Sequence, residues 1–418
     1  MLRGGYGIYY SRYVGQTIYQ SVLSPPFKVL RQIQGSANAA ASFANPFGPE
    51  VTLPQFVSYS PSTSLTPRFI AQDFRPPVTQ QYSLNLQTDL GSNLLLETGY
   101  VGARGTHQIT NRIYNQALLA SISSPIRGVT TNTIANIPLR VPYQGFAPIG
   151  LNSIQTTASA WYNSLEVSLT KRLSAGLQLL ASYTLASSLS TAAADTGTSG
   201  LNAIPGNQKD GHLNYGRSDF NRKHRFVASY LYQLPTAKRF SGFVKALLNG
   251  WSISGVTTFQ SGLPLTLTGT NSNNIFGITT DRAQLAAGCT YGDLVTKGSV
   301  TSQLNNYFNS SCILRTSSGA ATWRVIGDDG TATAFGNSGV GIVTGPGQRN
   351  WDISLMKRTS IRRLGESGNF ELRAEFFNAF NTPQFANPGT NVSAANFGVI
   401  SATSVNPRVV QLAVKINF

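Results

Sequence analysis

The sequence contains no apolar run of about 18 or more residues, so it predicts no transmembrane helix. The first residues, MLRGGYGIYYSRYVG, lack the continuous apolar region and the small-residue cleavage site of a signal peptide. If the protein is exported, we therefore expect its export signal to lie on sequence outside these 418 residues.

Charge is also scarce. Asp, Glu, Lys and Arg make up 11% of the chain, against roughly 25% in a typical soluble domain. Disorder is not the explanation, because 41% of the residues are apolar and 10% are aromatic. Such a composition indicates a surface that partly meets something other than water, or a large interior that is polar but uncharged.

The residues that a catalytic or metal-binding site would require are missing or scattered. His107, His212 and His224 are far apart in sequence, and none has a second ligand at metal spacing. The net charge is +16, but no basic stripe interleaved with aromatic residues marks a nucleic-acid surface. We therefore predict no enzyme, no metal or cofactor, and no nucleic-acid partner.

What the sequence does have is an alternation of apolar and polar residues. It is clear in YNSLEVSLTKRL (162–173) and in NFELRAEFFNAF (369–380). A period of two over this length is typical of strands with one apolar and one polar face. It predicts about ten strands, at residues 2–11, 79–90, 92–103, 159–172, 175–188, 224–235, 249–262, 348–360, 367–381 and 406–418.

The connections between these strands alternate in length. Those around Gly91-Ser92, Ser174-Ala175, 236–248 and 361–366 are short, and those at 12–78, 104–158, 189–223, 263–347 and 382–405 are long. This is typical of an up-and-down membrane barrel with short periplasmic turns and long extracellular loops. We therefore predict an all-β fold, an antiparallel transmembrane β-barrel segment. The alternative is a soluble antiparallel sandwich with one solvated face, but strands of 12–14 residues fit membrane spans better.

In the barrel interpretation the apolar face meets lipid and the polar face lines a wet lumen. Glu371, Arg373 and Glu375 are the charged candidates for the lumen. Basic pairs fall at the short turns: Lys171-Arg172, Lys238-Arg239 and Arg362-Arg363. They either meet anionic lipid headgroups or serve as solubilising turn residues, and the sequence leaves both interpretations open.

The loop predicted at 263–347 contains both cysteines of the chain, Cys289 and Cys312. An even, small number of cysteines in one exposed loop of an exported protein predicts a disulfide. The alternative is a pair of free thiols in a fragment that is not exported.

The chain ends on an amphipathic strand with alternating apolar residues, Val410, Leu412, Val414, Ile416 and Phe418. This ending resembles that of bacterial outer-membrane barrels, whose last strand finishes on an aromatic residue. The resemblance implies that these residues form the signal read by the barrel-assembly machinery.

Most of the strands resemble TonB-dependent outer-membrane transporters of the Oar-like subgroup. The segments that carry this resemblance are 78–107, 162–188, 219–235, 248–267, 345–357 and 370–389. The family implies a barrel of about 22 strands with a plugged lumen, preceded by a plug domain and a small β-sandwich. We therefore expect residues 1–418 to be the C-terminal part of the barrel domain, from a truncated gene product or a chain start placed too late.

The resemblance implies a place in the outer membrane and energy-coupled uptake of a bulky, unidentified ligand. The implied partners are outer-membrane lipid, the barrel-assembly machinery, and a TonB-type energy-coupling complex that acts through a plug not present in this chain. Two alternatives remain open: a passive outer-membrane pore, and a structural or adhesive surface barrel without active transport.

Overall fold

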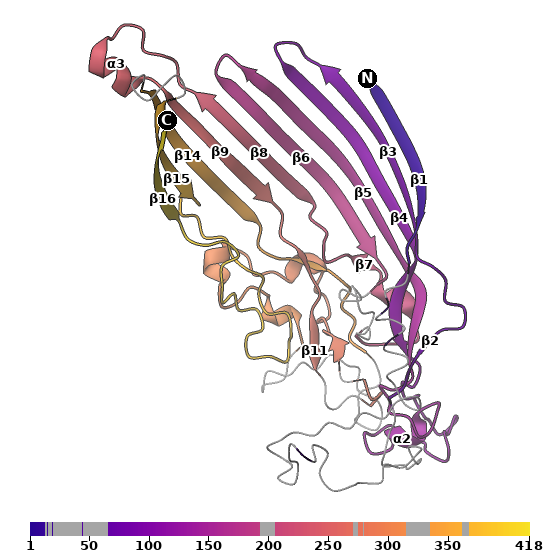
Figure 1. Ribbon diagram of the computed structural model, residues 1–418. Helices are drawn as coiled ribbons and strands as arrows, with labels where there is room; N and C mark the ends of the chain where they lie inside the picture. The colour runs from indigo at the N-terminus through magenta and orange to yellow at the C-terminus, as the bar shows by residue number, and fades with distance from the viewer. Residues whose placement is uncertain are drawn as a thin grey trace.

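The computed structural model describes residues 1–12, 15, 19, 44, 66–192, 205–270, 275–278, 280–314, 335–361 and 368–418. Its dominant element is one curved antiparallel sheet whose long strands follow one another in chain order (Figure 1). In that order the strands are β1 (Leu2–Tyr10), β3 (Val78–Asp89), β4 (Leu94–Ile113), β5 (Asn152–Ser174), β6 (Leu177–Ser190), β8 (His224–Gln233), β9 (Trp251–Gln260), β14 (Gln348–Ser360), β15 (Asn369–Phe377) and β16 (Val409–Asn417).

The smaller elements belong to the connections. The short strand β2 (Arg68–Ile70) pairs with β5, and β7 (Gly216–Arg217) pairs with β6. Two further ribbons lie outside the main sheet, β10 (Pro264–Leu265) with β13 (Val343–Thr344), and β11 (Thr268–Thr270) with β12 (Thr280–Arg282). The helical elements with described bounds are α2 (Ile137–Arg140), α3 (Gly242–Leu248), η1 (Gly211–Asn214), η2 (Tyr291–Asp293), η3 (Val300–Gln303) and η4 (Ser310–Cys312).

The predicted up-and-down order of strands is confirmed, and so is the separation of long and short connections. The described parts of the long connections gather at one end of the sheet, while the described short turns, α3 and both termini lie at the other (Figure 1). Arg362 and Arg363, predicted at the last short turn, lie outside the described residues.

Two strands are longer than the sequence pattern predicts. β4 has 20 residues and β5 has 23, so the connection between them shrinks to residues 114–151. Their ladder shifts register between Gly105 and Gln108 and again between Gln108 and Thr110. Each such irregularity resets the alternation of faces, which is why a strict period of two stops near residue 104.

The ladder aligns apolar residues with apolar residues across the sheet. Leu84 pairs with Tyr100, Tyr100 with Leu165, and Leu165 with Leu185. A slip of one residue would move a whole strand's apolar set to the other side. The register therefore divides the sheet into what we call the apolar face and the polar face.

Aromatic side chains follow the apolar face near the long-loop end. The ring centroids of Phe226 and Phe259 are 5.9 Å apart, those of Phe259 and Trp351 are 5.0 Å apart, and those of Trp351 and Phe380 are 5.2 Å apart. Girdles of this kind mark the boundary between lipid and water on membrane barrels. The apolar face therefore has a defined edge on the loop side.

The sheet has two free edges in the part of the chain that the structure describes, because β1 pairs only with β3 and β16 only with β15. No helix among the described residues is long and apolar enough to cross a membrane.

The hydrophobic core lies in the long loops rather than in the main sheet, which we call the wall. Its largest cluster contains Leu267, Leu294, Phe308, Val343 and Val392, which are at most 2% exposed. These residues come from the described parts of 263–347 and 382–405, which we call the loop assembly. A core of this kind shows that two connections distant in sequence fold against each other.

Candidate functional site: the polar face and the folded loops

Glu166 is at the centre of the polar face. Three cavities of about 480, 650 and 240 Å³ all have Glu166 in their lining. The pairing register places Thr184 between Glu166 and Arg225, and it places Gln260 next to Arg225. The polar face therefore presents the Glu166 carboxylate on β5 and the Arg225 guanidinium on β8, with β6 between them. The hydrogen-bonding side chains of Thr184 and Gln260 lie beside these two groups.

Arg222 adds a second cation to the 480 Å³ cavity, which Tyr162 and Gln260 also line. Its Nη1 donates a hydrogen bond to the Ser261 carbonyl oxygen at 2.7 Å. Burial, and then repulsion from Arg225, lower the pKa of Arg222 below its ordinary value. A ligand with an anionic group would relieve this repulsion between the two cations.

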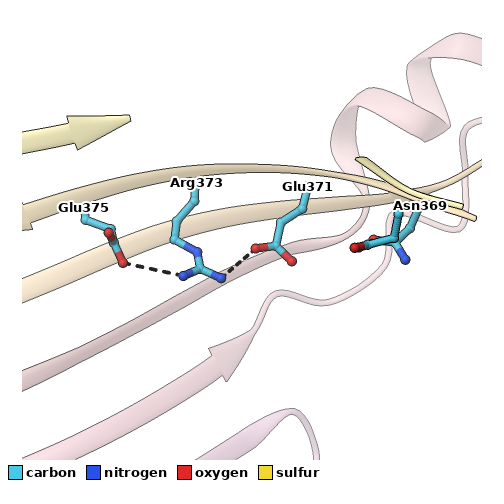
Figure 2. Close-up of polar contacts among 5 residues, drawn as sticks. Asn369, Glu371, Arg373 and Glu375 are labelled. Carbon is cyan, nitrogen blue, oxygen red and sulfur yellow. Dashed lines mark hydrogen bonds and ion pairs between the residues drawn. The ribbon is translucent and has the colours of Figure 1, made fainter. Parts of the chain in front are cut away.

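The predicted lumen residues form a strip of alternating charge along β15 (Figure 2). Arg373 lies between the two carboxylates, 2.6 Å from Glu371 through Nη2 and 3.7 Å from Glu375 through Nη1. On the adjacent strands Glu371 is opposite Arg358 on one side and Lys415 on the other. The structure thus gathers these residues on the polar face, where ion pairs with this exposure contribute about 1 kcal/mol or less to stability.

The C-terminal strand presents its alternating apolar residues on the opposite face. Leu412 is 73% exposed and Phe418 is 91% exposed. The register aligns the four strand residues with an apolar row on β15, Val410 with Phe376, Leu412 with Ala374, Val414 with Leu372, and Ile416 with Phe370. Side chains this apolar and this exposed need lipid rather than water around them.

The loop assembly is closed by a disulfide between Cys289 and Cys312, whose Cα atoms are 5.7 Å apart. Cys312 belongs to the buried cluster, and Cys289 packs against it. Beside them, burial raises the pKa of Tyr307 to about 12, and its hydroxyl donates to the Thr344 carbonyl oxygen at 2.8 Å. The assembly therefore has the packed and cross-linked interior of a small domain.

A buried arginine joins a second pair of loops. Arg140 is 0% exposed. Its Nη1 donates to the Leu118 carbonyl at 2.6 Å, and its Nη2 donates to the carbonyls of Thr133 at 3.0 Å and Ile275 at 2.7 Å. Since Ile275 is on the connection 263–347 and the others are on 114–151, this one side chain ties the two connections together.

A family model described as an outer membrane beta barrel domain matches residues 1–411. The chain belongs to this family of outer-membrane barrels. Its place is the outer membrane, with the long loops outside the cell and the short turns in the periplasm. A comparison with curated proteins finds no match.

Solved structures similar to this barrel chain include an outer membrane transporter of Escherichia coli, YddB, with a TM-score of 0.41 at 12% identity, covering 85% of this chain and 34% of that one. Another is the ferric-catecholate import receptor Fiu from E. coli K12, with a TM-score of 0.38 at 10% identity, covering 100% of this chain and 33% of that one. A third is BauA, the ferric preacinetobactin receptor of Acinetobacter baumannii, with a TM-score of 0.37 at 12% identity, covering 86% of this chain and 32% of that one. The chain spans about a third of the length of these structures.

Some residues of the site gave little signal in the sequence. Glu166 was visible there only as one polar position in an alternating strand, and Arg222 and Arg225 only as members of a basic stretch. Their convergence depends on the pairing of β5, β6 and β8. Among the described residues, no group of three His, Cys, Asp or Glu side chains is placed to hold a metal ion.

Proposed function

We propose that this chain forms part of the wall of an outer-membrane transporter for energy-coupled uptake of a bulky ligand. The observation that carries the proposal is the set of polar-face cavities around Glu166. A ligand captured by the loops would next meet this carboxylate, the two arginines and the ion-paired strip on β15.

Energy coupling needs a plug inside the barrel, and in this proposal the plug comes from outside residues 1–418. The TonB-type complex then acts through that plug, while Glu371, Arg373 and Glu375 face the lumen. The barrel-assembly machinery reads the exposed apolar residues of β16 together with Phe418.

Depletion of compounds from the growth medium tests this proposal even though the ligand is unidentified. Spent medium from the parent strain is compared by mass spectrometry with medium from a strain that lacks the gene, each with and without a protonophore. We expect a compound that only the parent removes, and only while its membrane is energised.

The same comparison separates the alternatives. Depletion that survives the protonophore would indicate a passive pore and contradict energy coupling. Equal depletion by both strains, with surface attachment lost in the deletion, would indicate an adhesive barrel. The cross-linked loop assembly is the observation that keeps adhesion as the second candidate, because a rigid, folded outer surface serves capture and attachment equally.

A further inference from the structure

The helix α3 lies in the turn between β8 and β9, at the periplasmic end of the wall (Figure 1). Its apolar side chains are exposed. None of its residues is buried. Phe243 is 81% exposed, Leu247 is 52% exposed, and Phe240, just before the helix, is 48% exposed. Three large apolar side chains so close together in one turn form an exposed patch that water does not favour.

Lys357 fixes the side of the sheet on which α3 lies. Lys357 pairs with Trp251 and follows Leu355 on the apolar face of β14. This lysine is nevertheless only 9% exposed, because its Nζ donates to the carbonyls of Ala246 at 2.6 Å, Leu247 at 3.0 Å and Asn249 at 2.8 Å. Since Lys357 starts from the apolar face, the C-terminal end of α3 lies over that face.

Trp251 strengthens the same attachment. Its indole Nε1 donates to the Leu247 carbonyl at 2.9 Å, and the Lys357 Nζ lies 5.1 Å from the centre of its ring. A lysine at the end of a helix complements the partial negative charge of the last carbonyls. The helix is therefore held at a defined place, beside the band of the wall that lipid covers.

The charge of the turn is entirely positive. Residues 236–250, TAKRFSGFVKALLNG, contain Lys238, Arg239 and Lys245 and no acidic residue. All three basic side chains are exposed. Exposed aromatic and aliphatic residues combined with lysine and arginine are the pattern of segments that lie in a membrane interface.

We propose that residues 236–250 are an interfacial anchor that binds the anionic phospholipid surface on the periplasmic side of the outer membrane. Phe240, Phe243 and Leu247 enter the boundary between headgroups and acyl chains. Lys238, Arg239 and Lys245 bind the lipid phosphates. The occupant is lipid because the patch continues the apolar face of the wall and because its charge is opposite to that of the phosphates.

The anchor gives the wall a fixed depth at its periplasmic rim. The apolar face alone resists vertical displacement, but a laterally projecting segment also resists tilting of β8, β9 and β14, to which it is joined. This inference does not depend on what the barrel transports.

Fluorescence quenching at single labelled sites tests the anchor. The protein is purified from outer membranes as Phe243→Cys, labelled at that thiol, and reconstituted into vesicles of phosphatidylethanolamine and phosphatidylglycerol. Phe220→Cys is the matched control, because Phe220 is 84% exposed and lies at the long-loop end of the wall. We expect nitroxide-bearing lipid to quench the label at 243, iodide to leave it unquenched, and the label at 220 to behave in the opposite way.

Lys245→Cys is a second labelled variant, and its label should be quenched by nitroxides near the headgroup rather than deep in the acyl chains. Replacing Lys238, Arg239 and Lys245 by Gln, or omitting phosphatidylglycerol, should lower lipid quenching at 243 by roughly twofold. Retained mobility of the folded form on an unheated gel identifies the variants that have kept their barrel. A label at 243 open to iodide, or shielded from both quenchers by protein, would overturn the proposal.

Discussion

At the scale of single residues, the structure repeatedly satisfies a cation with backbone carbonyls instead of carboxylates. Arg140 does so between two loops, and Lys357 does so at the end of α3. The chain has 32 Lys and Arg against 16 Asp and Glu, so acids cannot pair with every base. Carbonyl oxygens left free in loops and at the end of a helix provide the acceptors for Arg140 and Lys357.

Arg140→Met is expected to destabilise the loops by about 3 kcal/mol or more, because it removes a fully buried donor from the carbonyls of Leu118, Thr133 and Ile275. The wall should remain intact, since these three acceptors all lie in loops rather than in strands of the sheet. Limited proteolysis of outer membranes in increasing urea measures the effect as earlier cleavage within 114–151.

The matched control is Arg127→Met. Arg127 also donates to three carbonyls, those of Leu139, Val141 and Pro142, but it is more exposed than Arg140. Water replaces an exposed donor, so this variant should lose less than about 1 kcal/mol. Equal sensitivity of the two variants to protease would contradict the role given to burial of Arg140.

At the scale of elements, β16 shows how one strand serves two environments. Leu412 is on the apolar face opposite Ala374, and its neighbour Gln411 is on the polar face opposite Glu375. Leu412→Arg should therefore destabilise the folded barrel by about 2–4 kcal/mol, the effect of a cation near the middle of a lipid-facing strand.

Gln411→Arg is the control for that substitution, because the same cation now faces a carboxylate and should be tolerated. The yield of folded, heat-modifiable protein in outer membranes compares the two. Phe418→Ser should also lower this yield, through loss of the aromatic end of the strand. Full insertion of Leu412→Arg would show that this face does not meet lipid.

The loop assembly is the second element with a sharp test. Replacing Cys289 and Cys312 by Ser removes a cross-link between residues 23 apart in sequence and should destabilise the assembly by about 3 kcal/mol. Alkylation before and after reduction, followed by mass spectrometry of protein from outer membranes, first establishes that the thiols are paired. The variant should then be cleaved faster between residues 280 and 314, while the strands stay resistant; unchanged cleavage would contradict a stabilising bond.

The ten long strands could be predicted because their signal is local, and their up-and-down order followed from the alternation of short and long connections. The period of two alone is enough to assign residues such as Leu165 and Glu166 to the apolar or the polar face of the sheet. The extension of β4 and β5 could not be predicted, since the irregularities near Gln108 break that period. Helix α3 was missed because its seven residues fall in a turn and depend on contacts with Trp251 and Lys357, which are close only in space.

The candidate site was harder to predict than the wall. Glu371, Arg373 and Glu375 are two residues apart in sequence, so their shared face follows from one strand. Glu166, Arg222 and Arg225 meet only through the pairing of β5, β6 and β8. Arg140 gives no sequence signal at all, because its burial depends on two loops folding together.

At the scale of the whole molecule, the two free edges of the sheet determine what must happen in the membrane. An unpaired strand edge in lipid leaves backbone groups unsatisfied at several kcal/mol each. We therefore predict that β1 and β16 are paired in the outer membrane by strands from outside the described sheet. Hydrogen exchange in native membranes should show peptides 2–10 and 409–417 protected as strongly as β6, an interior strand. Rapid exchange at both edges would contradict this.

The strands of the wall differ in length, and this difference has a consequence for the capture of a ligand by the loops. At about 3.3 Å per residue, a strand of 23 residues such as β5 is roughly 75 Å long, against about 30 Å for the nine residues of β16. Since the lipid-facing band of such barrels is about 25 Å tall, β4 and β5 continue well beyond the bilayer as a stiff hairpin. The extracellular loops joined to β4 and β5 are therefore held on a rigid support. Their conformational entropy is lost when the protein folds and not when a ligand binds, so ordering these loops does not weaken ligand binding.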